Sequence, residues 1–386
     1  MSVHLKTYTH RYSLCEMSGP ILAHRNSLMG ASKQDTWRTR CARKLRINNR
    51  IVRGFLAEFL ATFAMIVFAS TAGVSNLARS SKFNIPPGSN ILMICIIQGA
   101  AVTFAIYIAG GITGGFLNPA VTVAWTILGR LNWKNCIAYC IAEYLGAFCA
   151  SGITFLTFYD LFFEARQSGP PPSYPIPWVV PTTEHLTVDG NTTLFGAGVA
   201  YHDYKNTFGT YPRDGISLVN AWIDQIVCSM MLLIGVLAVS DRRNWRPPDG
   251  LFPIIVGLMV MTVNLGFNFN TGSAMNPARD LSPRLFSYLI GMGPGIFEEM
   301  DYMWFLVPIL GSHAGAILGA MVYVTFIEVH WPETPKSIGN RVRSELSESS
   351  AVLTATKTVM PDSNESYPHP VQLLEENVPG RVDHSC

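Results

Sequence analysis

The chain has 386 residues, of which 49% are hydrophobic and only 14% are charged, whereas soluble domains usually carry about 25% charged residues. The formal net charge of +2 gives no reason to expect a nucleic-acid partner. The apolar residues gather in long runs and the charges gather between them, which is typical of an integral membrane protein.

The eight cysteines are scattered and show neither a metal-ligand spacing nor a disulfide framework. Cys136 and Cys140 are four residues apart, but no histidine or further cysteine completes a set. We therefore expect them to be small packing residues, with no bound metal and no cofactor. The sequence also shows no nucleophile–base pair and no phosphate loop, so an enzyme is not predicted.

The first 48 residues are polar and basic, without the apolar core that would mark a cleaved signal peptide. They lack apolar periodicity, and so do residues 331–386. Both ends are therefore predicted to be disordered tails. The segment between them, about 49–330, is predicted to form one membrane domain.

Six segments in this domain are long enough to cross a bilayer, which requires about 20 apolar residues. They are 52–75, 91–111, 133–159, 219–240, 251–269 and 303–327. Two further apolar stretches follow Asn118 and Asn276 and run for only about ten residues each. We predict that each is a re-entrant half-helix.

Lys and Arg residues near the helix ends predict the orientation of the spans. Segment 38–53 and the connection 240–250 are rich in Arg, so both are expected in the cytoplasm, together with both termini. The connection 160–217 is Pro-rich and net acidic and is expected outside, where Asn191 begins an N-glycosylation sequon. The expected destination is the plasma membrane.

The order span, span, half-helix, span occurs twice, over about 50–160 and about 218–330. Each half contains an odd number of full spans, so the second half must insert upside down relative to the first. Inverted repeats of this kind place a functional site at the membrane midplane. The predicted fold is an all-α integral membrane protein with six transmembrane helices and two re-entrant half-helices in an inverted repeat.

Both half-helices begin with the triplet Asn-Pro-Ala. Asn is a favoured N-cap residue and Pro is favoured at the first helical position, so the triplet can begin a helix inside a membrane. In an inverted repeat the two starts meet, and a cation between them would face two partial positive charges. Cations and protons are therefore expected to be excluded. The predicted pore residues are Asn118, Pro119, Ala120, Asn276, Pro277 and Ala278.

Arg279 and Asp280 follow the second triplet. A charge inside a membrane usually lines a water-filled path, and a guanidinium there can donate to a passing hydroxyl and repel cations. Asp280 comes four residues before Arg284, a spacing that favours an ion pair on a helix. The sequence leaves open whether Asp280 serves the pore or only braces the neighbouring loop.

Glu58, Glu143 and Gln225 lie inside predicted spans. Intramembrane carboxylates are candidate functional groups. However, Gln225 occupies the repeat position of Glu58, and an uncharged amide there argues against a proton relay. We expect these side chains to support the half-helix loops by hydrogen bonds.

The paired motifs GGFLNPAVT and TGSAMNPARD closely resemble those of the major intrinsic proteins, the aquaporin superfamily, and the likeness covers about 50–330. NPARD is similar to the glycerol-conducting branch, the aquaglyceroporins, for which Asp280 would be the marker. The resemblance implies a channel domain and a homotetramer with one pore per subunit in the lipid bilayer. It also implies passive flow of water, glycerol and other small neutral solutes, with urea a further candidate.

The resemblance also implies a four-residue constriction. Counting from the two Asn residues places it at Gln98, Asn264, Ser273 and Arg279. Similar glycerol channels commonly have an aromatic residue in this ring, so the present ring is more polar and could favour water or admit urea. Ser273 also stands where some relatives carry a cysteine that is blocked by mercurials, so block at this position is not expected.

Three alternatives stay open at this point. A strict water channel would fit the polar constriction. An ion-coupled secondary transporter also uses inverted repeats and broken helices, but it would need unpaired acidic residues at the midplane. A non-conducting junction protein would tolerate loss of the polarity that this pore keeps.

Overall fold

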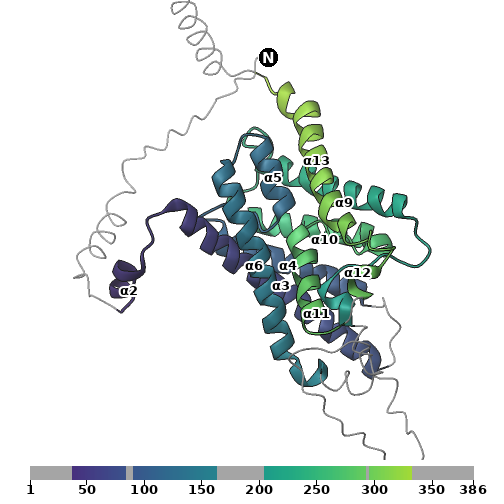
Figure 1. Cartoon of the computed structure of the whole chain (residues 1–386). Helices are drawn as coiled ribbons and strands as arrows, with labels where there is room; N and C mark the ends of the chain where they lie inside the picture. Colours follow the sequence, from purple (N-terminus) through teal and green to yellow (C-terminus); the bar gives the residue numbers. More distant parts are fainter. Residues whose placement is uncertain (1–36, 84–89, 163–203, 293–294, 333–386) are drawn as a thin grey trace, which may run out of the picture. The chain divides into compact units, whose positions relative to one another are not determined.

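The computed structural model describes residues 37–83, 90–162, 204–292 and 295–332. Every regular element in these ranges is a helix, which confirms the all-α prediction (Figure 1). Residues up to Glu328 belong to one compact unit, and a second unit begins at Val329. The sequon at Asn191 lies outside the described residues.

Six helices are long and apolar enough to cross a membrane, which confirms the predicted number of spans. They are α3 (Arg50–Lys82), α4 (Ile91–Ala109), α6 (Trp133–Thr157), α9 (Leu218–Ser240), α10 (Phe252–Thr271), and a last span in which the π-helix η2 (Val307–Gly311) continues as α13 (Ser312–Phe326). This last span begins later than predicted. Residues 301–305 form turns, and residues 300–302 have positive φ values of 52°, 54° and 64° that a helix does not allow.

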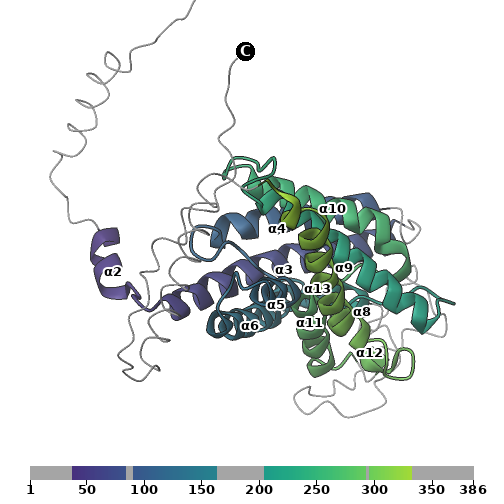
Figure 2. The ribbon, with the colours of Figure 1, turned by 90° about the horizontal axis from the view of Figure 1, so that it is seen from above.

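Two short helices, α5 (Pro119–Ile127) and α11 (Pro277–Leu289), are the predicted half-helices. Figure 1 shows them towards opposite ends of the bundle, and the view from above in Figure 2 shows them near the same axis. The packing follows the repeat: α3 pairs with α6, and α9 pairs with α13. Each half-helix also contacts the third span of the other half, α5 with α13 and α11 with α6. The two halves are thereby interlocked.

Glycine permits the closest helix packing at equivalent places in the two halves. A Cβ atom on Gly146 of α6 would lie 2.5 Å from the Phe59 carbonyl oxygen of α3. A Cβ atom on Gly315 of α13 would lie 2.2 Å from the Ile226 carbonyl oxygen of α9. Because the obstructing atoms are backbone, no side-chain rotation would relieve either contact.

Replacing Gly146 by leucine is therefore expected to lower the stability of the folded protein, by roughly 1–3 kcal/mol or more for overpacking of this kind. Gly266 of α10 offers a matched control, because a Cβ atom there meets nothing within 4 Å. The yield and thermal midpoint of detergent-solubilised protein should fall for Gly146→Leu and stay near wild type for Gly266→Leu. Equal behaviour of the two variants would contradict the role of this contact.

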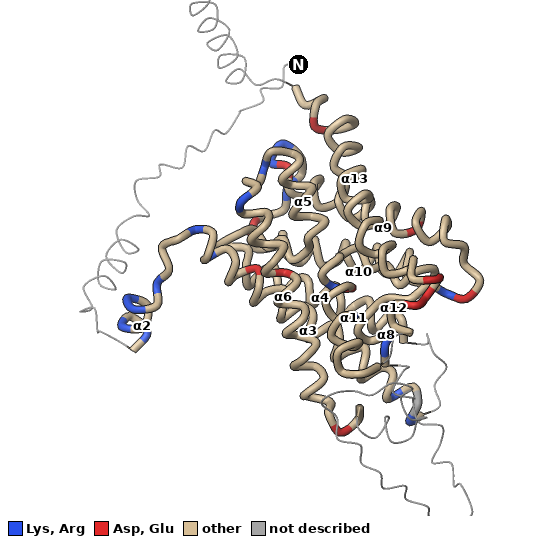
Figure 3. The backbone as a smooth tube through the Cα atoms, viewed as in Figure 1, with Lys and Arg blue, Asp and Glu red and all other residues tan. Residues whose placement is uncertain are grey.

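The outer faces of the spans are suited to lipid. Large apolar side chains are exposed along them, including Leu60, Ile96, Ile141 and Met231. Lys, Arg, Asp and Glu lie mainly in loops and near helix ends (Figure 3). A bilayer would cover such a surface without leaving charges in hydrocarbon.

The structure corrects the prediction of a disordered N-terminal tail over residues 37–45. These nine residues form the helix α2 (Trp37–Leu45), in which no residue is buried. Arg, Ala, Leu and Lys dominate the segment, so intrinsic helix propensity explains the helix where packing does not. Three further short elements complete the described chain: α8 (Lys205–Phe208), α12 (Gly295–Glu298) and η3 (Glu328–His330).

Candidate functional site

The two half-helices begin beside each other, and each N-cap side chain is bonded to the opposite loop. Asn118 Nδ2 donates to the Met275 carbonyl, and Asn276 Nδ2 donates to the Leu117 carbonyl, both at 2.8 Å. Each Asn Oδ1 also caps its own helix by accepting from the N–H two residues ahead, at 2.9 and 3.0 Å. An amide group carries two N–H donors, so each Asn has one further N–H for another molecule.

The residue before each Asn adopts a left-handed backbone conformation, with φ of 58° at Leu117 and 50° at Met275. Such a conformation costs roughly 1–2 kcal/mol for a residue with a Cβ atom. Side chains from the spans hold it in place. The Leu117 N–H donates to Glu58 Oε2 at 2.8 Å, and the Met275 N–H donates to Gln225 Oε1 at 3.5 Å. Glu58 and Gln225 thus support equivalent loops.

The sequence analysis missed a threonine five residues before each Asn. Thr113 Oγ1 donates to the Glu58 carboxylate. In the other half, Gln225 Nε2 donates to Thr271 Oγ1 at 2.7 Å, and the Thr271 hydroxyl donates to Asp224. The pattern Thr-Gly-x-x-x-Asn occurs in both TGGFLN and TGSAMN, so the repeat itself contained the signal.

Glu143 supports the first half-helix from the third span. It is fully buried in α6, and its Oε1 accepts from Thr122 Oγ1 of α5 at 2.8 Å. Glu143 does not line the cavity described next. Its position fits the expected structural role.

A cavity of about 630 Å³ passes the starts of both half-helices. Its wall contains both N-cap residues and all four positions of the predicted constriction: Asn118, Asn276, Gln98, Asn264, Ser273 and Arg279. Near the connection between α9 and α10, the same wall includes Tyr107, Arg246, Asp249 and Phe252. The structure therefore brings residues from four separate segments to one cavity.

Two of the constriction residues contact each other directly. Asn264 Nδ2 donates to Gln98 Oε1 at 2.7 Å. Gln98 lies seven residues after the first residue of α4, and Asn264 lies seven residues before the last residue of α10. At about 1.5 Å per residue, each is roughly 10 Å from the end of its helix, so the two side chains lie at similar depths in the bundle.

Two buried atoms in this wall, Asn264 Oδ1 and Ser273 Oγ, have no hydrogen-bond partner within the described part of the chain. Both residues are 2% exposed. A buried polar atom without a partner costs roughly 1–3 kcal/mol. Because both atoms are themselves buried, a molecule in the cavity could pair with them only after the side chains turn.

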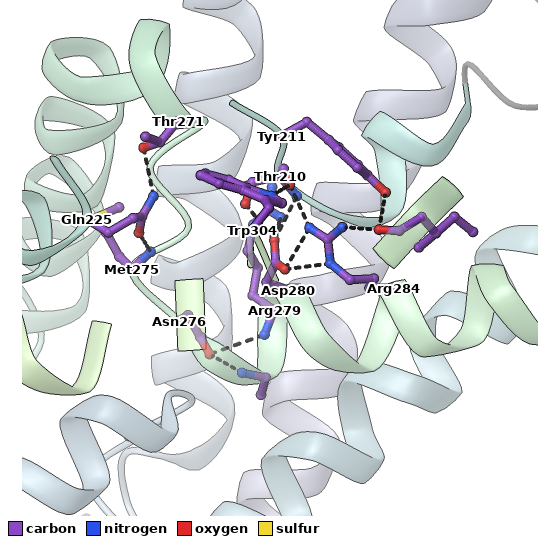
Figure 4. A network of polar contacts seen from close by, with 12 residues as sticks. Thr210, Tyr211, Gln225, Thr271, Met275, Asn276, Arg279, Asp280, Arg284 and Trp304 are labelled. Atoms are coloured by element: carbon purple, nitrogen blue, oxygen red, sulfur yellow. Dashed lines mark hydrogen bonds and ion pairs between the residues drawn. The ribbon is translucent and has the colours of Figure 1, made fainter. Parts of the chain in front are cut away.

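Asp280 braces a loop and does not line the cavity (Figure 4). It is fully buried, and its Oδ1 accepts from Arg284 Nε at 3.0 Å. Its Oδ2 accepts from the Thr210 N–H at 2.7 Å and from the Thr210 hydroxyl at 2.6 Å. Arg284 and Trp304 each donate to the Thr210 carbonyl, at 2.6 and 2.7 Å. Of the two roles left open by the sequence, the geometry favours the brace.

Tyr211 covers the arginine of this network. The Arg284 Cζ atom lies 4.5 Å from the centre of the Tyr211 ring, which is a cation–π distance. Burial raises the pKa of the Tyr211 phenol well above its ordinary value. The ring therefore stays neutral at physiological pH and adds no second negative charge beside Asp280.

The described part of the chain contains no group of three His, Cys, Asp or Glu side chains able to hold a metal ion. Its cysteines carry free thiols, and none of them lines the cavity: Cys41, Cys95, Cys136, Cys140, Cys149 and Cys228. A mercurial that reacts with these thiols would therefore not stand in the cavity itself.

Replacing Ser273 with cysteine should create such a block, because position 273 lines the cavity. Water permeability of vesicles containing Ser273→Cys is expected to fall on treatment with mercuric chloride and to recover with a thiol reductant. Wild-type vesicles treated in the same way are the control, because they show how much the reaction of mercury with the other thiols changes water permeability. A response no larger than that of wild type would place Ser273 away from the path.

Comparisons with known proteins agree with this arrangement. Residues 46–323 match the family model described as Major intrinsic protein. Aquaporin-2 of Milnesium tardigradum is 37% identical over 308 residues, which cover 80% of this chain and 85% of that protein. Aquaporin-9 of Homo sapiens is 34% identical over 316 residues, covering 82% and 95%. The structure of the aquaglyceroporin from Plasmodium falciparum shares the fold, with a TM-score of 0.57, 23% identity, and coverage of 72% of this chain and 97% of that one.

Proposed function

The chain belongs to the major intrinsic protein family, the aquaporin superfamily, and on this premise we propose that it is an aquaglyceroporin that conducts water, glycerol and urea passively. The family consists of multi-pass membrane channels, not enzymes. The proposal rests mainly on one observation. The two N-cap residues, Asn118 and Asn276, line the same cavity as Arg279, the charged residue that follows the second Asn-Pro-Ala triplet.

The charges on this wall favour neutral solutes. The starts of α5 and α11 are within hydrogen-bond reach of each other's loops, and each helix start carries about half a positive charge. Arg279 adds a positive charge at the second start, which is partly offset by the Asp280 carboxylate 3.9 Å away. A neutral molecule with lone pairs can accept from the Asn amides and the guanidinium, whereas a cation or proton meets only like charge.

The acidic side chains argue against an ion-coupled transporter. Glu58, Glu143 and Asp280 accept hydrogen bonds from hydroxyl, backbone or guanidinium groups and lie outside the cavity wall. Asp249 does line the cavity, but it forms an ion pair with Arg246. A coupled transporter would need an unpaired carboxylate at the meeting point of the half-helices.

The proposal also covers the orientation of the channel in the membrane and its oligomeric state. The Arg-rich segments 38–53 and 240–250 support an orientation with both termini in the cytoplasm, and this orientation would put Asn191 outside for glycosylation. The plasma membrane is the destination that we propose. The channel domain would span 49–330, between two tails. Exposed apolar faces on the spans supply the area that a homotetramer in lipid requires.

Stopped-flow light scattering on proteoliposomes tests the proposal. Sucrose should shrink the vesicles quickly, and glycerol should shrink them and then allow re-swelling much faster than in protein-free liposomes. Fast shrinkage with re-swelling at the rate of bare lipid would indicate a strict water channel. Shrinkage no faster than that of bare lipid would contradict the channel itself.

A further inference from the structure

Helix α2 (Trp37–Leu45) carries a narrow apolar stripe that nothing in the described part of the chain covers. Trp37, Cys41 and Leu45 follow one another at intervals of four residues, which places them on one face of the helix. All three line one surface hollow, and Trp37 and Leu45 are 74% and 75% exposed. A Trp and a Leu exposed on the same helix face point to a surface that they bind.

The place of α2 in the chain puts this stripe beside the membrane. Residues 46–49 are not helical, and Asn49 Oδ1 accepts from the Ile51 N–H at 2.9 Å, so α3 begins anew after a break. The chain from Leu45 to Arg50 reaches at most about 18 Å, and Arg50 is the first residue of the first span. Because of the break, α2 need not continue the direction of α3 away from the bilayer and can lie along its surface.

The charge of this segment matches an anionic surface. Between residues 37 and 53 the chain has seven Lys or Arg side chains and no Asp or Glu, and four of the seven are on α2 (Figure 3). With about 3.6 residues per turn, Arg38 and Lys44 lie at the two edges of the stripe. Long side chains there can rest their apolar stems on lipid and extend their charges to the headgroups. Basic clusters that only direct topology need no such stripe, whereas an interfacial helix needs both features.

We propose that α2 is an interfacial helix that docks on the lipid surface beside the first span and binds the headgroups of anionic phospholipids. Trp37 and Leu45 enter the boundary between headgroups and acyl chains, and the basic side chains contact the phosphates and carboxylates. The proposed orientation puts α2 on the cytoplasmic side, whose leaflet carries these lipids. A basic amphipathic helix can also bind an acidic protein, but the short connection to α3 holds this one at the bilayer. The inference does not depend on which solutes the channel conducts.

Hydrogen–deuterium exchange of the full-length chain in lipid nanodiscs tests the inference. Isolated helices shorter than about 12–15 residues are marginal in water, so the amides of the nine-residue α2 should exchange quickly unless a surface holds the helix. The comparison is between nanodiscs of phosphatidylcholine and nanodiscs in which phosphatidylserine is mixed with it. Exchange over residues 37–45 should be at least about tenfold slower in the mixed lipid, because each basic residue near an anionic surface favours binding by about fivefold. Added salt should reduce this difference.

Two double variants with the same change in net charge test the residues. Arg38→Gln/Lys44→Gln removes the charges at the edges of the stripe and keeps the helix, since Gln, Lys and Arg have similar helix propensities. It should lose most of the effect of phosphatidylserine. Arg79→Gln/Arg242→Gln removes two exposed charges outside α2 and should keep the full effect. Unchanged exchange in the six spans shows that each variant is folded.

Three results would overturn the inference. Equally fast exchange of α2 in both nanodiscs would mean that it does not bind lipid, and would leave an acidic protein as its partner. Equally slow exchange in both would mean that something other than an anionic headgroup covers it. An effect of phosphatidylserine that persists in Arg38→Gln/Lys44→Gln would place the recognition elsewhere. None of these results bears on the channel proposal, which the flux of water and glycerol decides.

Discussion

Replacing Asp280 with alanine is expected to destabilise the protein by about 3–5 kcal/mol, the range for breaking a buried ion pair by removing one partner. Asp280 and Arg284 are both fully buried, with Arg284 Nη2 2.9 Å from Asp280 Oδ1. Alanine would leave the guanidinium buried without a carboxylate. It would also remove the acceptor that holds the Thr210 N–H and hydroxyl.

Thermal midpoints of detergent-solubilised protein, measured by size exclusion, would show this loss. Asp214→Ala serves as the control, because Asp214 is exposed in the neighbouring loop. The double variant Asp280→Ala/Arg284→Leu should be more stable than Asp280→Ala alone, since it removes the orphaned charge. If Asp280→Ala proves as stable as Asp214→Ala, the brace is unimportant, and the acidic residue after Arg279 must act in the pore.

Replacing Arg279 with valine should open the pore to charged solutes while it continues to conduct water. Its guanidinium lines the cavity, and its side chain is 20% exposed. At 4 Å and an effective dielectric constant of about 20, it repels a cation by on the order of 4 kcal/mol. If only half of this energy, about 2 kcal/mol, contributes to the barrier, its loss would raise proton or cation flux by roughly 30-fold.

A pH-sensitive dye inside proteoliposomes, with the membrane potential clamped by valinomycin and potassium, would report this flux. Arg279→Lys keeps the charge, so its proton flux should stay close to that of wild type. The Asn118 and Asn276 helix starts persist in both variants and should retain part of the barrier. Unchanged proton flux in Arg279→Val would remove Arg279 from the exclusion mechanism.

The sequence predicted the features that depend on local residue patterns or on the internal repeat. Asn is favoured at the N-cap and Pro at the first helical position, so the starts of α5 and α11 could be predicted from the sequence. The meeting of the two half-helix starts was predicted from the inverted repeat, but the bond from Asn118 to the Met275 carbonyl, 157 residues apart, was not. Gln98 and Asn264, 166 residues apart, were placed opposite each other only because the family resemblance supplied a count.

The rest depends on contacts that no local pattern contains. Thr210 joins Asp280 and Trp304 across 70 and 94 residues, and its loop position gave no sign of this role. Equally, the sequence showed that the constriction is polar, but not that Asn264 Oδ1 and Ser273 Oγ would be left without partners. Helix α2 was missed because helix propensity is a weak predictor in a charged segment whose apolar stripe has only three residues.

The most direct test of the channel measures glycerol and protons in the same wild-type vesicles. Proteoliposomes containing the pH dye would be exposed to a glycerol gradient by stopped flow and then to a pH gradient under clamped potential. We expect re-swelling in glycerol well above the rate of bare lipid, together with proton flux that does not exceed it. Fast proton entry, or glycerol entry that requires an ion gradient, would contradict a passive pore guarded by the two half-helix starts and Arg279.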